Sequence, residues 1–315
     1  MSTKEQILKH LIEKSDCFIS GEELAKTIGV SRAAVWKGIK SLQKEGYAID
    51  AVTNRGYKLS QENDILNEQI VSSKLGGRTK VFYYPSIDST NTQAKRLINE
   101  DIHEDMLVIC DEQTAGRGRQ GKSFYSPALT GIYMSYVTHP MAPLQNAVTA
   151  TTAAAVAVCR AVEKLTDKKP QIKWVNDVYL DGKKICGILT EAVTDFESQT
   201  VTSVIIGIGM NIKTVHFPES VENGASLNAN VKRADLIAQI TKELIEINSS
   251  DYSDFIAYYR KHSMIIGNKI NFIKNGKVTP ATAVEIDSTG GLVVELENKD
   301  IITLRSGEIS IRLDH

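Results

Sequence analysis

The sequence predicts an α+β fold in three successive parts, and three observations indicate it. A helix-turn-helix pattern with a short hairpin behind it occupies residues 1–63. A long mixture of strand-like and helix-like segments follows over residues 64–264, and alternating apolar and polar residues with tight turns fill residues 265–315. A chain of 315 residues is long for one domain, which agrees with two or three.

The composition is that of an ordinary soluble globular protein. The chain is 42% hydrophobic and 24% charged, and its formal net charge of −1 excludes a general polycation. Contact with nucleic acid would therefore require a local basic face. The charged N-terminus has no signal-peptide pattern, the longest apolar run is broken by threonines, and the four cysteines lack metal-ligand spacing. We expect a cytoplasmic protein with reduced thiols and no membrane contact.

The first part of the chain has the pattern of a winged helix-turn-helix. One apolar stripe marks a first helix, formed by Ile7, Leu8, Leu11 and Ile12. Ser20, in capping-box spacing with Glu23, opens a short helix that closes at Gly29, and Ser31 caps the next helix, "RAAVWKGIKSLQKE". The segment "YAIDAVTNRGYKLS" then predicts two short strands, which would form the wing.

The outer face of the second helix and the tip of the wing carry candidate DNA contacts. Cations there can meet phosphates, and an aromatic ring can touch a thymine methyl group. The predicted DNA-binding residues are Ser31, Arg32, Trp36, Lys37, Lys40, Asn54 and Arg55. A charged helix face is usually only solvated and a single Trp usually belongs to a core, so the prediction depends on the whole winged arrangement.

The segment "DEQTAGRGRQGKSFYSP" contains a glycine-rich loop. Gly116, Gly118 and Gly121 fit the dinucleotide-binding spacing G-x-G-x-x-G, which requires a following helix and an acidic residue about 20 positions later. A strand-like segment, "GIYMSYV", follows instead, and no Asp or Glu occurs from Gln113 through Val162. The sequence therefore excludes a Rossmann loop.

The chemistry of this loop favours an anion of another kind. Glycines let backbone N–H groups turn toward an anion, and Arg117, Arg119 and Lys122 add positive charge. A plain basic surface turn is the alternative for this motif alone. Three further segments weigh against that alternative: the polar "IDSTN" before a helix, "IKWVNDVYLDGKKICGIL", and "VIIGIGMNI", whose Gly207 and Gly209 would let a flat ligand approach the backbone.

In this order, "DSTN", "DEQTAGRGRQG", "KWVND", "KKICGIL" and "GIGMN" resemble the motifs of biotin protein ligases, in particular the bifunctional type that also represses the biotin operon. The resemblance covers nearly the whole chain, and it depends on the combination of motifs. It implies a winged helix-turn-helix over residues 1–63, a mixed α/β catalytic domain like that of class II aminoacyl-tRNA synthetases over residues 64–264, and an SH3-like β-barrel over residues 265–315.

The resemblance also implies roles for individual residues. Ser89, Thr90 and Gln113 match the groups that bind the ureido ring of biotin, whose donors and acceptor suit hydroxyls and an amide. The implied biotin-binding residues are Ser89, Thr90, Asn91, Gln113, Gly116, Arg117, Gly118, Arg119, Lys184, Gly187, Gly207 and Gly209. The implied nucleotide-binding residues are Arg119, Lys122, Phe124, Lys173, Asn176 and Asn211. The implied catalytic residues are Arg117, Arg119, Asp177 and Lys184.

The implied reaction uses ATP, biotin and Mg²⁺. Biotin is adenylated to biotinoyl-5′-AMP, and a lysine of the biotin carboxyl carrier protein of acetyl-CoA carboxylase or pyruvate carboxylase then attacks it. We expect no protein-only metal cage: Mg²⁺ would arrive with ATP, with Asp177 as its candidate contact. Asp177 is also a candidate for orienting or deprotonating the acceptor amine, and a structural role is its alternative. Bound biotinoyl-5′-AMP would promote a homodimer on two-fold symmetric operator DNA.

The sequence departs from the family pattern at three places. Val175 stands where Trp-Pro-Asn-Asp has its Pro, Phe124 stands where many members have a Trp over adenine, and "GASL" at 224–227 replaces Ala-Thr-Ser-Leu. The adenine contacts are therefore the least certain part. Two alternatives remain open: a lipoate or octanoate ligase, which would need a longer apolar tunnel, and a transcription regulator that senses a small molecule without ligase activity.

Overall fold

The structure is a computed structural model, and its contacts divide the chain into two units. It describes residues 2–60, 63–77, 79–100, 102, 104–139, 147–195, 197–198, 200–221, 223–249, 252–274, 277–305 and 308–311. The first unit comprises residues 1–78 with 232–235, and the second comprises residues 79–231 with 236–315. The predicted boundary at 63/64 falls inside the first unit and that at 264/265 inside the second, so both remain predictions.

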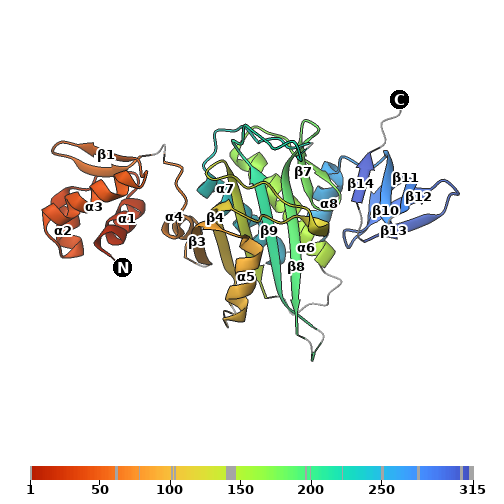
Figure 1. Ribbon diagram of the computed structural model, residues 1–315, viewed down its shortest axis with the longest axis horizontal. Coiled ribbons are helices and arrows are strands. Elements are labelled where there is room, and N and C mark those ends of the chain that lie inside the picture. The colour runs from red at the N-terminus through yellow and green to blue at the C-terminus, as the bar shows by residue number, and fades with distance from the viewer. Residues whose placement is uncertain are drawn as a thin grey trace. The chain divides into compact units, whose positions relative to one another are not determined.

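The first unit contains the predicted winged helix-turn-helix (Figure 1). Its elements are α1 (Thr3–Glu13), α2 (Gly21–Ile28), α3 (Arg32–Lys44), β1 (Ile49–Val52), β2 (Gly56–Leu59) and the short α4 (Glu68–Lys74). Strands β1 and β2 pair antiparallel and form the wing. The three helices pack around buried residues of the predicted stripes, among them Ile7, Leu11, Val35, Ile39 and Leu42.

Local capping interactions set the bounds of these helices. Ser31 Oγ accepts a hydrogen bond from the backbone N–H of Ala34 at 3.2 Å, and Gly29 ends α2 in the left-handed conformation with φ 77°, both as predicted. Ser20 also caps as predicted, but the reciprocal capping box lies at α1, between Ser2 and Glu5. The Glu23 side chain pairs instead with Lys14, the C-cap residue of α1, at 2.6 Å.

A seven-stranded mixed sheet forms the centre of the second unit. Its strands are β3 (Lys80–Ile87), β4 (Met106–Gln113), β5 (Gly131–Thr138), β6 (Gln171–Lys173), β7 (Asp177–Leu180), β8 (Lys183–Thr194) and β9 (Val201–Asn211). The strand order is β3-β4-β5-β9-β8-β7-β6, with β3 and β4 parallel and the other neighbours antiparallel. After the glycine loop the chain enters β5 rather than a helix, which agrees with the exclusion of a Rossmann loop.

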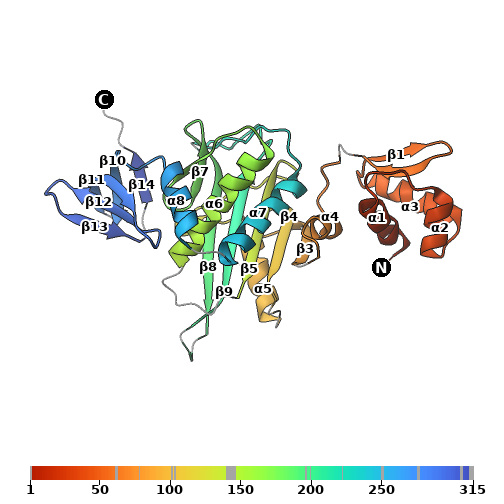
Figure 2. The same cartoon turned by 180° about the vertical axis from the view of Figure 1, so that it is seen from behind.

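Helices cover both faces of this sheet. Helix α5 (Thr90–Asn99) lies on one face, where Ala94 and Leu97 pack against buried residues of β4, β5 and β9 (Figure 1). Helices α6 (Ala147–Leu165), α7 (Arg233–Ser249) and α8 (Tyr252–His262) lie on the opposite face (Figure 2). The small buried side chains of α6, including Ala154, Ala155 and Ala157, let its backbone approach the sheet closely.

The C-terminal part is all-β, as the alternation predicted. Its strands are β10 (Lys269–Lys274), β11 (Lys277–Ile286), β12 (Leu292–Leu296), β13 (Ile301–Leu304) and β14 (Glu308–Ile311). They form one antiparallel sheet in the order β13-β12-β11-β10-β14, and the SH3-like closure remains a prediction. In the part of the chain that the structure describes, no helix has the length and apolar character needed to span a bilayer.

We predict that Ser31→Ala destabilises α3 locally by about 1 kcal/mol, because the N–H of Ala34 loses its side-chain acceptor. Hydrogen exchange of the amides of residues 32–44, followed by mass spectrometry on the full chain, measures this opening free energy. Ser41→Ala in the same helix is the matched control, since the Ser41 hydroxyl donates to the side chain of Glu45, at 3.0 Å, and does not cap the start of the helix. Equal protection in both variants would contradict the capping role.

Candidate active site

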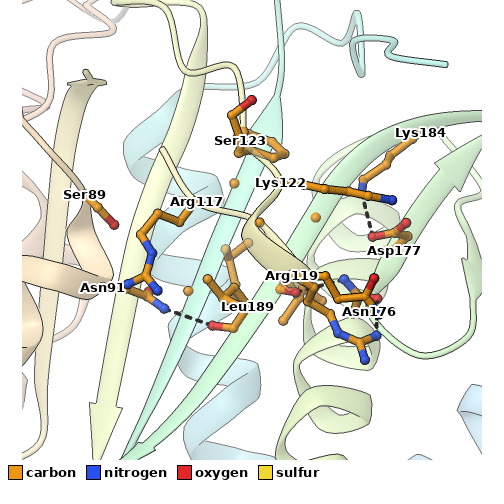
Figure 3. A pocket seen from close by; sticks show the side chains of 18 of the residues that line it. Ser89, Asn91, Arg117, Arg119, Lys122, Ser123, Asn176, Asp177, Lys184 and Leu189 are labelled. Carbon is orange, nitrogen blue, oxygen red and sulfur yellow. Dashed lines mark hydrogen bonds and ion pairs between the residues drawn. The ribbon is translucent and has the colours of Figure 1, made fainter. Parts of the chain in front are cut away.

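A pocket of about 270 Å³ opens on the face of the central sheet that carries the N-terminus of α5 (Figure 3). Its walls come from the start of α5, the end of β4, the glycine loop that follows β4, and strands β7, β8 and β9. Segments that are up to about a hundred residues apart in the chain therefore meet here, as the hydrogen bond between Asn91 and Leu189 illustrates with a separation of 98 residues.

Most of the residues predicted for a small-molecule site line this one pocket. The lining includes all four candidate catalytic residues, Arg117, Arg119, Asp177 and Lys184. It also includes Ser89, Thr90, Asn91, Gln113, Gly118, Lys122, Phe124, Lys173, Asn176, Gly187, Gly207 and Gly209. Two predicted residues, Gly116 and Asn211, are not part of this lining, and their binding roles remain predictions.

One end of the pocket is built from hydroxyls and amides. Gln113 Oε1 accepts hydrogen bonds from Thr90 N at 2.9 Å and Thr90 Oγ1 at 3.2 Å, while its Nε2 donates to Ser126 Oγ at 2.9 Å. Ser89 occupies the N-cap of α5, yet its side chain makes no capping hydrogen bond. Neutral polar groups are thus fixed beside the hydroxyl of Ser89, an arrangement suited to an uncharged polar ring.

Asn91 is a buried support for this end. Its side chain is 3% exposed, accepts from Ser135 Oγ at 2.6 Å and donates to Leu189 O at 3.1 Å and Glu191 Oε2 at 2.9 Å. A Cβ atom on Gly207 would lie 2.2 Å from Asn91 Oδ1. The sequence predicted that a ligand approaches the backbone at Gly207. In the structure, the Asn91 amide occupies the space above that backbone.

The opposite end of the pocket is charged. Lys184 Nζ lies 2.7 Å from Asp177 Oδ1, and Arg119 Nη1 donates to Asn176 Oδ1 at 3.1 Å (Figure 3). Asn176 Nδ2 donates in turn to Ile188 O at 3.0 Å, which fixes the direction of its carbonyl oxygen. These contacts hold two cations at the same end of the cavity.

Positive charge dominates the pocket as a whole. Among the described residues that line it, five are cationic, Arg117, Arg119, Lys122, Lys173 and Lys184, and one, Asp177, is acidic. The described residues contain no group of three or more His, Cys, Asp or Glu side chains that could hold a metal ion. The excess of cations in the pocket suits an anionic ligand.

Phe124 lies over two of the predicted biotin-binding glycines, Gly187 and Gly209. A Cβ atom would meet the Phe124 ring at 2.5 Å from Gly209 and at 3.2 Å from Gly187. The loop thus folds its own aromatic ring onto the backbone where the sequence predicted a flat ligand. A ligand that lies directly on Gly209 must displace this ring or share its face.

Sequence reasoning assigned no role to Glu191 on β8, although this residue joins the glycine loop to the sheet. Its Oε1 lies 2.8 Å from Lys95 Nζ and 3.4 Å from Arg117 Nη2. Burial raises the pKa of the Glu191 carboxyl, but hydrogen bonds from Lys95 and Asn91 and the charges of Lys95 and Arg117 outweigh burial and hold the pKa below its ordinary value. Glu191 therefore remains ionised and holds Arg117 at the hydroxyl and amide end.

Sequence reasoning also assigned no role to several other lining residues, Gln120, Ser123, Trp174, Ile188, Leu189 and Ile208. Ser123 lies inside the loop motif, and Trp174 lies inside "KWVND", so motif membership was an available signal for both. The aliphatic residues Ile188, Leu189 and Ile208 lie in continuous apolar runs of β8 and β9, and only the fold identifies which residues of these runs line the pocket.

The predicted DNA contacts form a separate exposed set in the first unit. The exposed members are Ser31, Arg32, Trp36, Lys37, Lys40, Asn54 and Arg55. Trp36 is 53% exposed, so it does not belong to the core. Arg55 lies 4.5 Å from the ring centroid of Phe18, which orders the tip of the wing. These positions agree with a nucleic-acid surface, and the individual contacts remain predictions.

Comparison with known proteins identifies relatives along the whole chain. Residues 83–211 match the Biotin/lipoate A/B protein ligase family, residues 3–58 match an HTH domain, and residues 265–312 match the Biotin protein ligase C terminal domain. The Bifunctional ligase/repressor BirA of Bacillus subtilis (strain 168) is 32% identical over 98% of both chains. The protein of the same name from Escherichia coli (strain K12) is 29% identical over 94% of this chain and 93% of its own.

A solved structure shares the fold of most of the chain. A biotin protein ligase from Aquifex aeolicus, in complex with biotin and ATP, superposes with a TM-score of 0.61 at 24% identity, covering 74% of this chain and 98% of its own. At this identity the likeness shows a shared fold.

We predict that Glu191→Gln removes part of the pH dependence of stability. The pKa of Glu191 is lower in the folded state than its ordinary value of about 4.5. Glu191 therefore adds to the free energy of unfolding at pH values above 4.5, and this stabilisation is lost as the pH falls through the folded-state pKa. The variant should be less stable at pH 7 by about 1–2 kcal/mol and should lose less stability between pH 6 and roughly pH 3.

Thermal unfolding across that pH range measures the difference. Glu112→Gln on β4 is the matched control, since this carboxylate accepts a hydrogen bond from Ser86 Oγ at 3.1 Å and lies outside the pocket lining. Parallel pH curves for wild type and Glu191→Gln would show that the Glu191 network does not stabilise the fold.

Proposed function

The chain belongs to the family of bifunctional ligase/repressors, and from that premise we propose which of its residues carry each part of the work. It is an ATP-dependent ligase that attaches biotin to protein, with a helix-turn-helix domain for repression. The single observation that supports our residue assignments is the division of one pocket into a neutral polar end and a cationic end. Biotin and ATP need both chemistries side by side.

The ureido ring of biotin binds at the hydroxyl and amide end. Ser89 and Thr90 offer hydroxyls at the start of α5, and the Gln113 amide holds Thr90 in place. A urea carries two donors and a strong acceptor, so these neutral groups satisfy it without the desolvation that a charged site would cost. Asn91 and Glu191 stabilise this end through hydrogen bonds within the protein, and neither contacts the ring in this assignment.

The nucleotide binds at the charged end, beside Lys173, Asn176 and Lys184. Asn176 and Asp177 are the oxygen donors available there, and a single carboxylate with an amide suits a magnesium ion that is held mainly by phosphates. When bound with the nucleotide, Mg²⁺ would lower the negative charge on the phosphates. Phe124 is placed to stack on a planar ring that enters over Gly209.

The first reaction step joins two anions, and the cations of the pocket make that approach possible. The biotin carboxylate attacks the α-phosphorus of ATP, a carboxyl–phosphate bond forms, the bond to the β-phosphate breaks, and pyrophosphate leaves. Arg117, Arg119 and Lys184 offset the repulsion and hold the reacting atoms in line. For this they must exchange their present partners for substrate, Glu191 in the case of Arg117 and Asp177 in the case of Lys184.

The second step transfers biotin to the amine of a lysine on a biotin carboxyl carrier protein. The amine attacks the mixed anhydride, an amide forms, and AMP leaves with the bonding electrons. Asp177 lies beside Lys184 with one oxygen at 2.7 Å from it. We assign Asp177 to orienting or deprotonating the amine once Lys184 has turned to the phosphate, because a carboxylate freed from its cation becomes a better proton acceptor.

Repression combines the exposed cations of the wing and α3 with dimerisation of the second unit. Strand β7 pairs with β8 only along Lys183–Gly187, so among the described residues Leu189–Thr194 of β8 lack a strand neighbour on that side. An unpaired strand edge beside the glycine loop is a surface that a second copy can pair with when the loop is ordered by biotinoyl-5′-AMP. A homodimer would then present two helix-turn-helix units to a two-fold symmetric operator.

The alternatives fit the site less well. A lipoate or octanoate ligase needs an apolar tunnel, whereas the end of the pocket at Ser89, Thr90 and Gln113 is polar. A regulator without ligase activity would not require Lys184 with both loop arginines in the same cavity. Binding of labelled biotin against lipoate separates the first alternative, and biotin-dependent exchange of pyrophosphate into ATP separates the second.

We predict that Lys184→Ala lowers the rate of biotin-dependent pyrophosphate exchange by about 10²–10³, because a cation that contacts developing charge is removed. Biotin binding without ATP should be weakened less than exchange, since the ureido end is intact. Lys183→Ala is the matched control, because Lys183 is an exposed neighbour on β8 that lies outside the pocket lining. A folded Lys184→Ala variant with near-normal exchange would remove Lys184 from the mechanism.

We predict that biotinoyl-5′-AMP raises both the dimer fraction and the affinity for operator DNA. Sedimentation and gel-shift measurements are made without ligand, with biotin alone, and with biotin plus MgATP, and the third condition should give the largest values. Linkage requires that operator DNA also tighten adenylate binding. Equal dimer fractions and equal operator affinity in all three conditions would leave the ligase and exclude the co-repressor.

A further inference from the structure

The wall of the active site is tied to the C-terminal sheet through a tryptophan. Trp174 lines the pocket and is 3% exposed. Its indole Nε1 donates a hydrogen bond at 2.9 Å to the carbonyl oxygen of Gly290, which is 116 residues further along the chain. Because an indole has one polar hydrogen and no acceptor, this bond is the full polar satisfaction of the side chain and fixes its orientation.

Residues that follow the catalytic sheet in the sequence also hydrogen-bond to the backbone on both sides of Trp174. The N–H of Met264 donates to Ile172 O at 3.0 Å, and Tyr259 Oη donates to Val175 O at 3.3 Å. The segment from Lys173 to Asp177, which carries the charged end of the pocket, therefore rests on residues that follow the catalytic sheet in the sequence.

One carboxylate shapes the turn that presents the Gly290 carbonyl. Asp287 Oδ1 accepts hydrogen bonds at 2.8 Å from Thr289 N, Thr289 Oγ1 and Gly291 N. Arg305 from the end of β13 lies 3.2 Å from Asp287 Oδ2 and also donates to the Thr289 hydroxyl. Burial raises the pKa of the Asp287 carboxyl, but these hydrogen bonds and the Arg305 charge hold it below its ordinary value, so Asp287 remains ionised.

The same turn is packed onto the catalytic domain. Thr149 Oγ1 on α6 donates to Thr289 O at 3.3 Å. A Cβ atom on Gly290 would lie 2.9 Å from the Cγ2 atom of Thr152, so the backbone of the turn directly contacts the helix. The position of the carbonyl that receives the indole is therefore fixed relative to the pocket.

We propose that Asp287 is a positioning residue for the adenylation step, acting through the Gly290 carbonyl on Trp174 and so on the nucleotide-binding segment. Asp287 touches no substrate in this scheme. The proposal rests on the assignment of Lys173 and Asn176 to the nucleotide in the proposed function. The ureido end is built from other elements, α5 and β4. Loosening the turn at Asp287 should therefore lower kcat/KM for ATP while the affinity for biotin is retained.

The experiment uses Trp174 as its own reporter. The chain has two tryptophans, so a Trp36→Phe background leaves Trp174 as the single one, and every variant is compared with that background. Asp287→Ala should shift the Trp174 emission to longer wavelength and lower kcat/KM for ATP in pyrophosphate exchange by about 10- to 100-fold, the scale of a small misplacement in an active site. The Kd for biotin, measured without ATP, should stay within about twofold of the background on the same reasoning.

Two further variants separate positioning from general loss of structure. Asp287→Asn keeps an oxygen that can accept the three turn hydrogen bonds, so it should recover most of the emission and of kcat/KM. Asp300→Ala removes a carboxylate from the exposed turn between β12 and β13, where Asp300 Oδ2 accepts from Asn298 Nδ2 at 2.6 Å, and it should match the background in both measurements.

The outcomes distinguish this proposal from the proposed function. Unchanged kinetics in Asp287→Ala, equal losses for ATP and biotin, or no recovery in Asp287→Asn would each overturn the positioning role. If Asp287→Ala does not fold, Trp174→Phe removes the indole donor while leaving the turn intact, and it should show the same selective loss for ATP. A background protein without biotin-dependent exchange would instead refute the proposed function, while the emission shift would still report the contact between Trp174 and the turn.

Discussion

The buried amide of Asn91 is the interaction on which the geometry of the active site depends. It connects the first turn of α5 to Ser135 on β5 and to the backbone of Leu189 on β8, with its side chain above Gly207 of β9. A buried amide must satisfy its donors and acceptor together, because each unpaired group costs about 1–3 kcal/mol. One side chain therefore sets the spacing between the helix that bears Ser89 and Thr90 and the strands that form the floor of the pocket.

The parts of the fold that the sequence predicted correctly are those governed by short-range interactions. Ser31 caps α3 through a residue three positions away, and Gly29 ends α2 by its own conformation, so both could be recognised from local pattern. The wing and the alternation of the C-terminal strands are of the same kind. The capping box was misplaced because the Glu23 side chain, at the correct spacing, forms an ion pair with Lys14, the C-cap residue of α1.

The residues that sequence reasoning missed depend on distant partners. Glu191 acquires its importance from Lys95 and Arg117, and Trp174 from Gly290, none of which is near it in the chain. Motif resemblance placed most binding residues at the pocket, yet it could not show that the Asn91 amide lies over Gly207 and the Phe124 ring over Gly209. Side-chain competition of this kind appears only when the chain is folded.

The excess of cations in the pocket has a consequence for encounter as well as for chemistry. The formal net charge of the whole chain is −1, whereas the pocket lining has five cations and one carboxylate among the described residues, so the other residues together carry a net negative charge. A positively charged pocket attracts a polyanion at distances up to about one Debye length, roughly 8 Å at physiological ionic strength. Nucleotide capture should therefore slow as salt is added, while capture of the weakly charged biotin changes less, and ionic strength alone would alter which substrate arrives first.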